Sequence, residues 1–153
     1  MSTNFELHQV PGLAAAANVF AGTVATDIIK MPAEGILFTL HKGVGATGTT
    51  VVTALACDDV DATSTHAVAY KYRISTTVDT WGEWTEATTT GFTTSTGSNQ
   101  LYQIWVAAEE LAHIGYAYVK LVCTEAAANA VAGGIIATLV GARYKEQPES
   151  LIV

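Results

Sequence analysis

The stretch Val68-Ala-Tyr-Lys-Tyr-Arg-Ile-Ser75 decides the fold class of this chain. Large apolar or aromatic side chains occupy every second position, and small or polar side chains fill the positions between them. Alternation with a period of two is typical of a β-strand that turns one face to a core and the other to solvent. The stretch therefore predicts a strand whose buried row is Val68, Tyr70, Tyr72 and Ile74.

Segments of the same character lie on both sides of this strand and are rich in Val, Ile, Thr and aromatic residues, which favour strands. The expected strands are Asp27–Met31, Ile36–Lys42, Thr49–Cys57, Trp81–Thr85, Leu101–Ala107, Tyr116–Thr124 and Gly134–Tyr144. The core residues expected from them are Ile36, Phe38, Leu40, Ile104, Val106, Val119, Leu121, Ile135, Ala137 and Leu139. In Tyr116–Thr124 the choice of face stays open, because Tyr116 and Tyr118 compete for the interior.

The number and spacing of these strands indicate an all-β fold. Roughly eight short strands with turns about every ten residues are typical of an antiparallel β-sandwich or jelly roll. Glu109–His113 predicts a single helical turn, whereas a parallel α/β fold would need amphipathic helices between its strands. We expect one antiparallel, jelly-roll-like β-sandwich domain over residues 23–146.

The two ends of the chain predict elements that bind a partner. Residues 1–22 read as an extended N-terminal arm, broken at Pro11-Gly12, and residues 147–153 as a tail that follows the domain. We expect both to cross onto neighbouring subunits, and truncation of either to leave the fold intact; for the tail, folding back onto its own domain stays an alternative. The candidate partner-binding residues are Phe5, Leu7, Val10, Leu13, Phe20, Leu151, Ile152 and Val153.

Composition and charge disfavour two classes of partner. The net charge is −7, and no window of five residues holds more than two Lys or Arg, so nucleic acid is not expected as a partner. No secretory leader is expected, and Ala126–Ala142 is too short and too rich in glycine for a membrane span, so it predicts a pair of buried strands. Many small apolar residues and few charges suggest that a partner covers part of the surface.

The reactive residues do not combine into a catalytic or metal site. Cys57 and Cys123 are expected to be free and buried, and the four histidines are too scattered for zinc. Asp58, Asp59 and Asp61 favour a solvated loop over a cation site, because the glycine and the distal glutamate of a calcium loop are missing. Glutamate pairs at 83/86 and 109/110 are weak candidates for a glycosidase, and no Gly-x-Ser-x-Gly motif occurs. We expect no cofactor and no enzymatic activity.

The segment Thr80-Trp-Gly-Glu-Trp-Thr85 holds the remaining candidates for binding. Trp81 and Trp84 predict either an aromatic platform for a sugar or protein partner, or a simpler arrangement in which one ring caps the core and the other lies at its rim. Packing is the favoured interpretation, and both residues are kept as partner-binding candidates.

A resemblance to a known class of proteins comes from the second half of the chain. The segments Leu101–Leu111, Gly115–Glu125 and Ala132–Tyr144, with Asp27–Met31 and Gly35–Leu40 before them, resemble a strand pattern found in small structural proteins of tailed phages. Such proteins are encoded near the major capsid protein. The resemblance covers about residues 23–145 of this chain and includes no catalytic motif.

What the resemblance implies is a head decoration protein that stabilises the capsid. It implies binding to the major capsid protein, self-association most commonly as a trimer, and a place on the outer capsid surface of a virion assembled in the host cytoplasm. The alternative that stays open is a carbohydrate- or receptor-binding module of a phage tail that uses Trp81 and Trp84.

Overall fold

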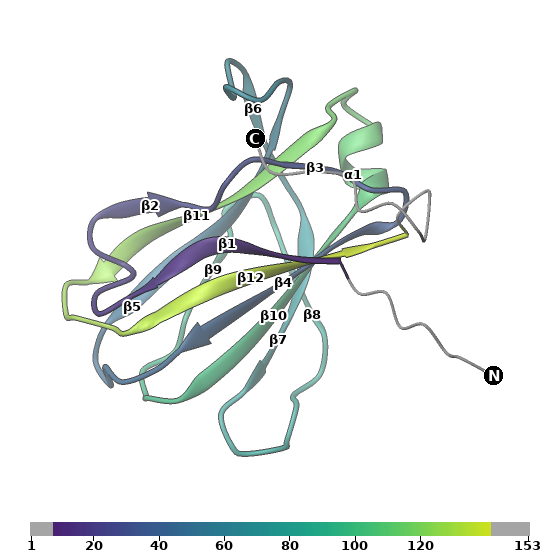
Figure 1. Ribbon diagram of the computed structural model, residues 1–153. Coiled ribbons are helices and arrows are strands. Elements are labelled where there is room, and N and C mark those ends of the chain that lie inside the picture. The colour runs from purple at the N-terminus through teal and green to yellow at the C-terminus, as the bar shows by residue number, and fades with distance from the viewer. Residues whose placement is uncertain (1–7, 142–153) are drawn as a thin grey trace.

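The computed structural model describes residues 8–141, which form two antiparallel β-sheets around a common core (Figure 1). In sheet A the strand order is β1 (His8–Ala16), β12 (Gly133–Val140), β4 (Gly35–Lys42), β10 (Gln100–Ala107), β7 (Tyr70–Ser75) and β8 (Thr85–Ala87). Sheet B has the order β2 (Thr23–Ala25), β11 (Tyr118–Ala127), β5 (Thr49–Cys57) and β6 (Thr65–Val68), with β3 (Ile29–Lys30) beside β11 and β9 (Phe92–Thr93) beside β5. Helix α1 (Ala108–Ala112) follows β10. The all-β sandwich expected from the sequence is confirmed, and its jelly-roll form stays a prediction.

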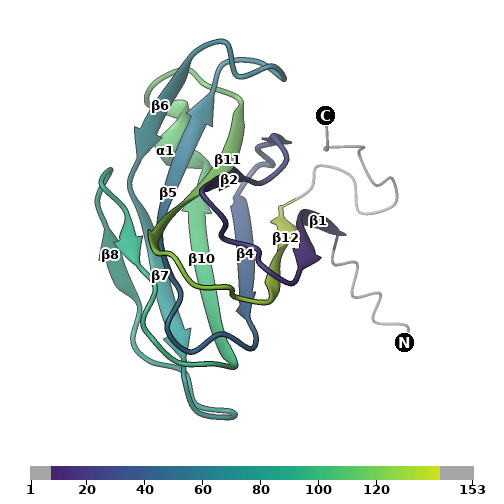
Figure 2. The same ribbon diagram turned by 90° about the vertical axis from the view of Figure 1, so that its left-hand side faces the viewer.

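Strands that are far apart in the chain pair with each other in a nested order. The first strand, β1, pairs with the last, β12, and β2 pairs with β11. Further in, β4 pairs with β10, and β5 pairs with β6. In Figure 2 the strands of sheet A follow one another from β8 on the left to β1 on the right. The chain therefore folds back on itself like one long hairpin whose pairs alternate between the sheets.

The core is built from the alternating rows that the sequence predicts. All ten core residues expected from the strands other than Val68–Ser75 are buried, and Val119 and Leu121 rather than Tyr118 fill the interior from β11. From the opening stretch, Val68 and Tyr70 are buried, whereas Tyr72 and Ile74 are half-buried. The ring of Phe92 covers Tyr72, with the two ring centroids 3.9 Å apart and nearly parallel.

The opening stretch is not one strand, because it passes from one sheet to the other at Ala69. Val68 ends β6 and pairs with Ala54 in sheet B, whereas Tyr70 begins β7 in sheet A. Both Val68 and Tyr70 point into the core, so the alternation continues without a break through the change of sheet. Alternation records which side faces the interior and carries no information about which sheet a residue joins.

The prediction that residues 1–22 form an extended arm is wrong for residues 8–22. Strand β1 pairs with β12 from His8, opposite Leu139, to Ala16, opposite Gly133. Val10 and Phe20 are buried in the domain's own core. Truncation of residues 1–20 would remove a strand of sheet A and these core side chains, so it would not leave the fold intact.

Several expectations fall on residues that lie outside the described range. They include Phe5 and Leu7 at one end and Leu151, Ile152 and Val153 at the other. The stretch 126–141, for which a membrane span was considered and rejected, contains the end of β11, a turn and β12. Among residues 8–141 no helix is long and apolar enough to cross a membrane.

Replacing Phe38 with alanine tests the core. Phe38 lies fully buried at the centre of β4, so Phe38→Ala should lower the free energy of unfolding by about 3–5 kcal/mol, since the cavity cannot fully collapse. Val78→Ala is the control, because Val78 is 94% exposed and its truncation should change stability by less than about 0.5 kcal/mol. Urea unfolding measures both, and a similar effect of the two variants would contradict this core.

Candidate functional site

The outer face of sheet A carries the side chains that alternate with the core. Cross-strand neighbours across this face are Thr138, Leu37 and Trp105 in one row, Ile136, Thr39 and Gln103 in the next, and Gly134, His41 and Leu101 in a third. With histidine neutral, none of these residues is charged. We call this surface, without Trp105 and with Gln9 and Pro11 of β1, the neutral half of the face; Trp105 lies opposite Lys71 of β7, where the charged side begins with Lys71 and Arg73.

An open apolar groove of about 930 Å³ lies at one corner of the neutral half. Ile136, which is 50% exposed, contributes to it from β12, and residues 13–17 of β1 and the following turn line one side. The groove exists because β1 crosses closely over β12: a Cβ atom at Gly134 would lie 3.1 Å from the Cα atom of Ala15. Leu13 lines this groove and is half-buried, so of the candidates in residues 8–22 it is the one placed at a surface site.

Trp81 and Trp84 both contact Arg73 on the outer face of sheet A. The guanidinium carbon of Arg73 is 4.8 Å from the ring centroid of Trp81 and 4.7 Å from that of Trp84. Gly82, between the two tryptophans, donates its N–H to the carbonyl oxygen of Ile74 at 2.9 Å and holds the segment against β7. The interpretation that one ring caps the core is wrong, because neither the half-buried Trp81 nor Trp84, which is 43% exposed, belongs to the core or packs against it.

Trp105, the third tryptophan, also faces outward from sheet A. Its ring covers Gly35 of the neighbouring strand β4, because a Cβ atom there would lie 2.7 Å from two ring atoms. An aromatic ring over a glycine of the adjacent strand is held against the sheet on one side. The outward position of Trp105 follows from alternation with the buried Ile104 and Val106, although Trp105 is not among the binding candidates expected from the sequence.

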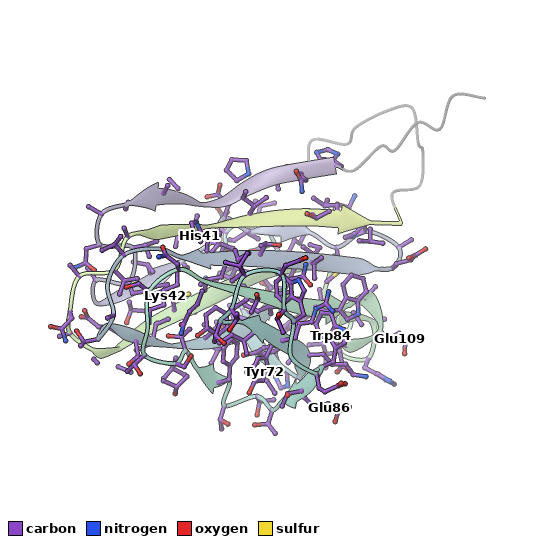
Figure 3. All side chains as sticks on the ribbon, turned by 90° about the horizontal axis from the view of Figure 1, so that it is seen from below. His41, Lys42, Tyr72, Trp84, Glu86 and Glu109 are labelled. Atoms are coloured by element: carbon purple, nitrogen blue, oxygen red, sulfur yellow. The ribbon has the colours of Figure 1, made fainter. Side chains whose placement is uncertain are left out.

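A hollow of about 520 Å³ lies beside Trp105, on the charged side of the face. Its lining includes Glu86 of β8 and Glu109 and Glu110 of α1, together with Lys71 of β7. Figure 3 shows Glu86, Glu109 and Trp84 at one end of the molecule and His41 at the other. The glutamate pairs considered from the sequence, 83/86 and 109/110, are near neighbours in the chain. The fold instead brings Glu86 of β8 to Glu109 and Glu110 of α1.

The aspartate loop after β5 is occupied by its own hydrogen bonds. The carboxylate of Asp59 accepts hydrogen bonds from the N–H of Thr63, the hydroxyl of Thr63 and the N–H of Asp61, at 2.9–3.0 Å. These bonds, those from Thr63 first, lower the pKa of Asp59. The solvated-loop interpretation is therefore favoured, and within residues 8–141 no group of His, Cys, Asp or Glu is arranged to hold a metal ion.

A buried lysine, Lys42, closes the opposite end of the sandwich. Its ammonium donates a hydrogen bond to the carbonyl oxygen of Ser95 at 2.7 Å, and burial lowers the pKa of Lys42. Nearby, the Tyr102 hydroxyl donates to the Gln100 side chain at 2.9 Å and accepts from the Ser95 N–H at 2.9 Å. This network ties the loop after β9 to sheet A, which is a structural role.

Comparison with protein-family models, with curated proteins and with solved structures found no match for this chain. An inference about function therefore rests on the residues and geometry of the chain itself, and on the resemblance in strand pattern noted above.

Removing the cation between the two tryptophans tests their arrangement. Arg73→Ala should lower the free energy of unfolding by at least about 1–2 kcal/mol, because two cation–π contacts of about 0.5–1 kcal/mol each are lost together with the hydrogen bond that Arg73 Nε donates to Gln103 Oε1 at 2.7 Å. It should also change the tryptophan fluorescence. Lys71→Ala is the matched control on the same strand face, since the exposed Lys71–Glu86 ion pair, at 3.8 Å, contributes between about 0 and 1 kcal/mol. Equal effects of both variants would refute the stack.

Cys57 and Cys123 are free and buried, as expected, and the burial of Cys123 should make the stability of the protein depend on pH. Burial raises the pKa of Cys123 from 9.0 to about 12. Because the thiol ionises more readily in the unfolded chain, it contributes stability that is present below pH 9 and is lost as pH rises from 9 towards 12. The stability gap between the wild type and Cys123→Ala should narrow by about 1 kcal/mol between pH 9 and 10, where the unfolded thiol passes from half to almost full ionisation. Urea unfolding at pH 8, 9 and 10 measures it, and a gap independent of pH would be contrary to this burial.

Proposed function

We propose that this protein is a non-enzymatic structural protein of a phage virion, which decorates and stabilises the capsid by binding the major capsid protein. The observation that carries the proposal is the neutral half of the outer face of sheet A. A chain of net charge −7 leaves this broad surface without a charged residue and places an apolar groove in it. The cores of protein–protein interfaces are likewise depleted in charge.

The strand order supports the same proposal. The nested pairs β1–β12, β2–β11, β4–β10 and β5–β6, divided between two sheets, are the arrangement expected of a jelly roll of eight strands, to which β7 and β8 add an extension at one edge. Jelly rolls occur in viral capsid and lectin domains. A fold does not assign a function, so the weight rests on the surface and on the resemblance of residues 101–144 to small phage structural proteins.

The proposed attachment places the neutral half against the shell. Ile136 is the most exposed large apolar side chain on β12 and lines the groove, so its contact with a partner would remove apolar surface from water. A trimeric assembly on the outer capsid surface is part of the proposal and is supported by the resemblance alone.

A charge introduced at Ile136 should abolish attachment. Wild-type protein mixed with capsids that lack it should co-sediment with them, and Ile136→Asp should bind at least tenfold more weakly, because a desolvated carboxylate in an apolar contact is unfavourable. Val78→Asp, which adds the same charge at an exposed residue of the β7–β8 connection, is the matched control and should bind like the wild type.

Two outcomes of this experiment would refute parts of the proposal. If Ile136→Asp binds as tightly as the wild type, the neutral half is not the attachment surface. If the wild type fails to bind capsids at all, the decoration function itself is wrong. Sedimentation equilibrium of the free protein tests the trimer separately.

A second candidate is a carbohydrate- or receptor-binding module of a phage tail. The specific observation in its favour is that all three tryptophans of the chain, Trp81, Trp84 and Trp105, lie on the outer face of sheet A. Binding of a glycan by the free protein together with no binding to capsids would favour this candidate over decoration.

A further inference from the structure

We propose that the hollow beside Trp105 is a binding site for a neutral saccharide, with a pyranose ring stacked on the outward side of the indole. The hollow lies on the charged side of sheet A, away from the groove beside Ile136. The inference does not depend on capsid decoration; it deepens the carbohydrate-binding candidate by giving it a site and a class of ligand.

The hollow has a structural origin in the way two strands end. The chain enters sheet A after Ala69, where β7 begins at Tyr70, and leaves it at Ala107, where β10 gives way to α1. The small side chains of Ala69, Ala87 and Ala107 line the space and do not fill it. Its volume of about 520 Å³ lies in the range of roughly 300–1,000 Å³ that is typical of small-molecule sites.

Trp105 supplies a preorganised apolar surface in this hollow. Gly35 makes room for the ring on the sheet side, so the ring is held in place before a ligand arrives. One side of a pyranose is apolar because its C–H bonds point there, while its hydroxyls lie around the rim. A rigid aromatic ring flanked by polar groups matches both parts of such a ligand at little cost in side-chain ordering.

The charged groups of the hollow favour a neutral ligand rich in hydroxyls. Glu86, Glu109 and Glu110 repel an anion. Lys71 stands between Trp105 and Glu86 in the strand register, and its ammonium lies 3.8 Å from the Glu86 carboxylate, so it offsets one of the three negative charges. A polyol donates hydrogen bonds to the carboxylates and accepts them from the ammonium, and it therefore suits both signs of charge.

The same face offers room for more than one sugar ring. Arg73 follows Lys71 by two residues on β7, which is about 6.6 Å along the strand on the same face, and it carries the rings of Trp81 and Trp84. A saccharide that starts on Trp105 can continue towards Trp84. Oligosaccharides should therefore bind more tightly than monosaccharides.

Isothermal titration with a defined set of sugars tests the site. The probes are glucose, galactose, mannose and N-acetylglucosamine with their linear hexamers, plus sialyllactose as an anionic sugar and a trilysine peptide as a cation. At least one neutral hexamer should bind, more tightly than its monomer, and quench tryptophan fluorescence. Trp105→Ala should weaken this binding at least tenfold, whereas Trp105→Phe, which keeps an aromatic ring, should weaken it less than Trp105→Ala.

Two further variants separate the site from general damage to the fold. Glu109→Ala alters an exposed residue of α1 that lines the hollow and should weaken sugar binding at least threefold with an unchanged melting temperature. Glu83→Ala is the matched control, because Glu83 is exposed in the β7–β8 connection and does not line the hollow, so binding should not change. If Trp105→Ala does not fold, the Glu109 and Glu83 pair decides the outcome.

The inference is overturned if no neutral sugar binds, if Glu109→Ala binds like Glu83→Ala, or if trilysine or sialyllactose binds more tightly than every neutral hexamer. Capsid co-sedimentation of Glu109→Ala should match the wild type, since this residue lies outside the neutral half. The failure of sugar binding and the failure of capsid attachment are therefore separate results.

Discussion

The inner faces of sheets A and B pack against each other, and the rest of the structure depends on this contact. Sheet A contributes large residues such as Phe38, Leu40, Tyr102 and Ile104, and sheet B contributes Leu121 and Phe92 together with the smaller Val52, Ala54, Ala56 and Cys123. Two facing sheets share a layer of limited thickness, so large residues at some positions require small ones at others. Only part of the Ala and Val that suggested a covered surface serves the core, mainly valines such as Val52 and Val119, and the two thiols are buried as small apolar groups.

The outer face of sheet A takes its chemistry from the same constraint. Every second residue of β4, β10 and β12 is committed to the core, so the remaining row is all that these strands can offer to a partner. On β12 and β4 that row holds Ile136, Thr39 and Leu37, without charge. On β10 and β7 it holds Trp105, Lys71 and Arg73, which combine aromatic and charged groups. One sheet therefore presents two surfaces of different character, one suited to a protein partner and the other to a polar ligand.

The site was predictable to the extent that it depends on alternation. The outward positions of Trp105 and Ile136 follow directly from the buried rows at Ile104 and Ile135, although the sequence analysis named neither as a binding residue. Trp81 and Trp84 were named, but their contact with Arg73 was not. Arg73 lies on β7 and the two tryptophans lie in the segment that follows it, and spacing in the sequence does not show that this segment folds back over Arg73. Val10 and Phe20 were assigned to a partner and belong to the core, since a short apolar segment looks the same in both roles.

The sequence by itself determined where most strands lie and which of their side chains are buried, because a period of two is a local property of the backbone and of each side chain's affinity for water. The tertiary structure decided which strands become neighbours. It paired β1 with β12 across almost the whole chain, divided Val68–Ser75 between two sheets, and brought Glu86 to Glu109 beside Trp105. These outcomes depend on which strand edges and side chains are available for pairing once all the other strands are paired. That is a property of the whole chain, and no single stretch of sequence determines it.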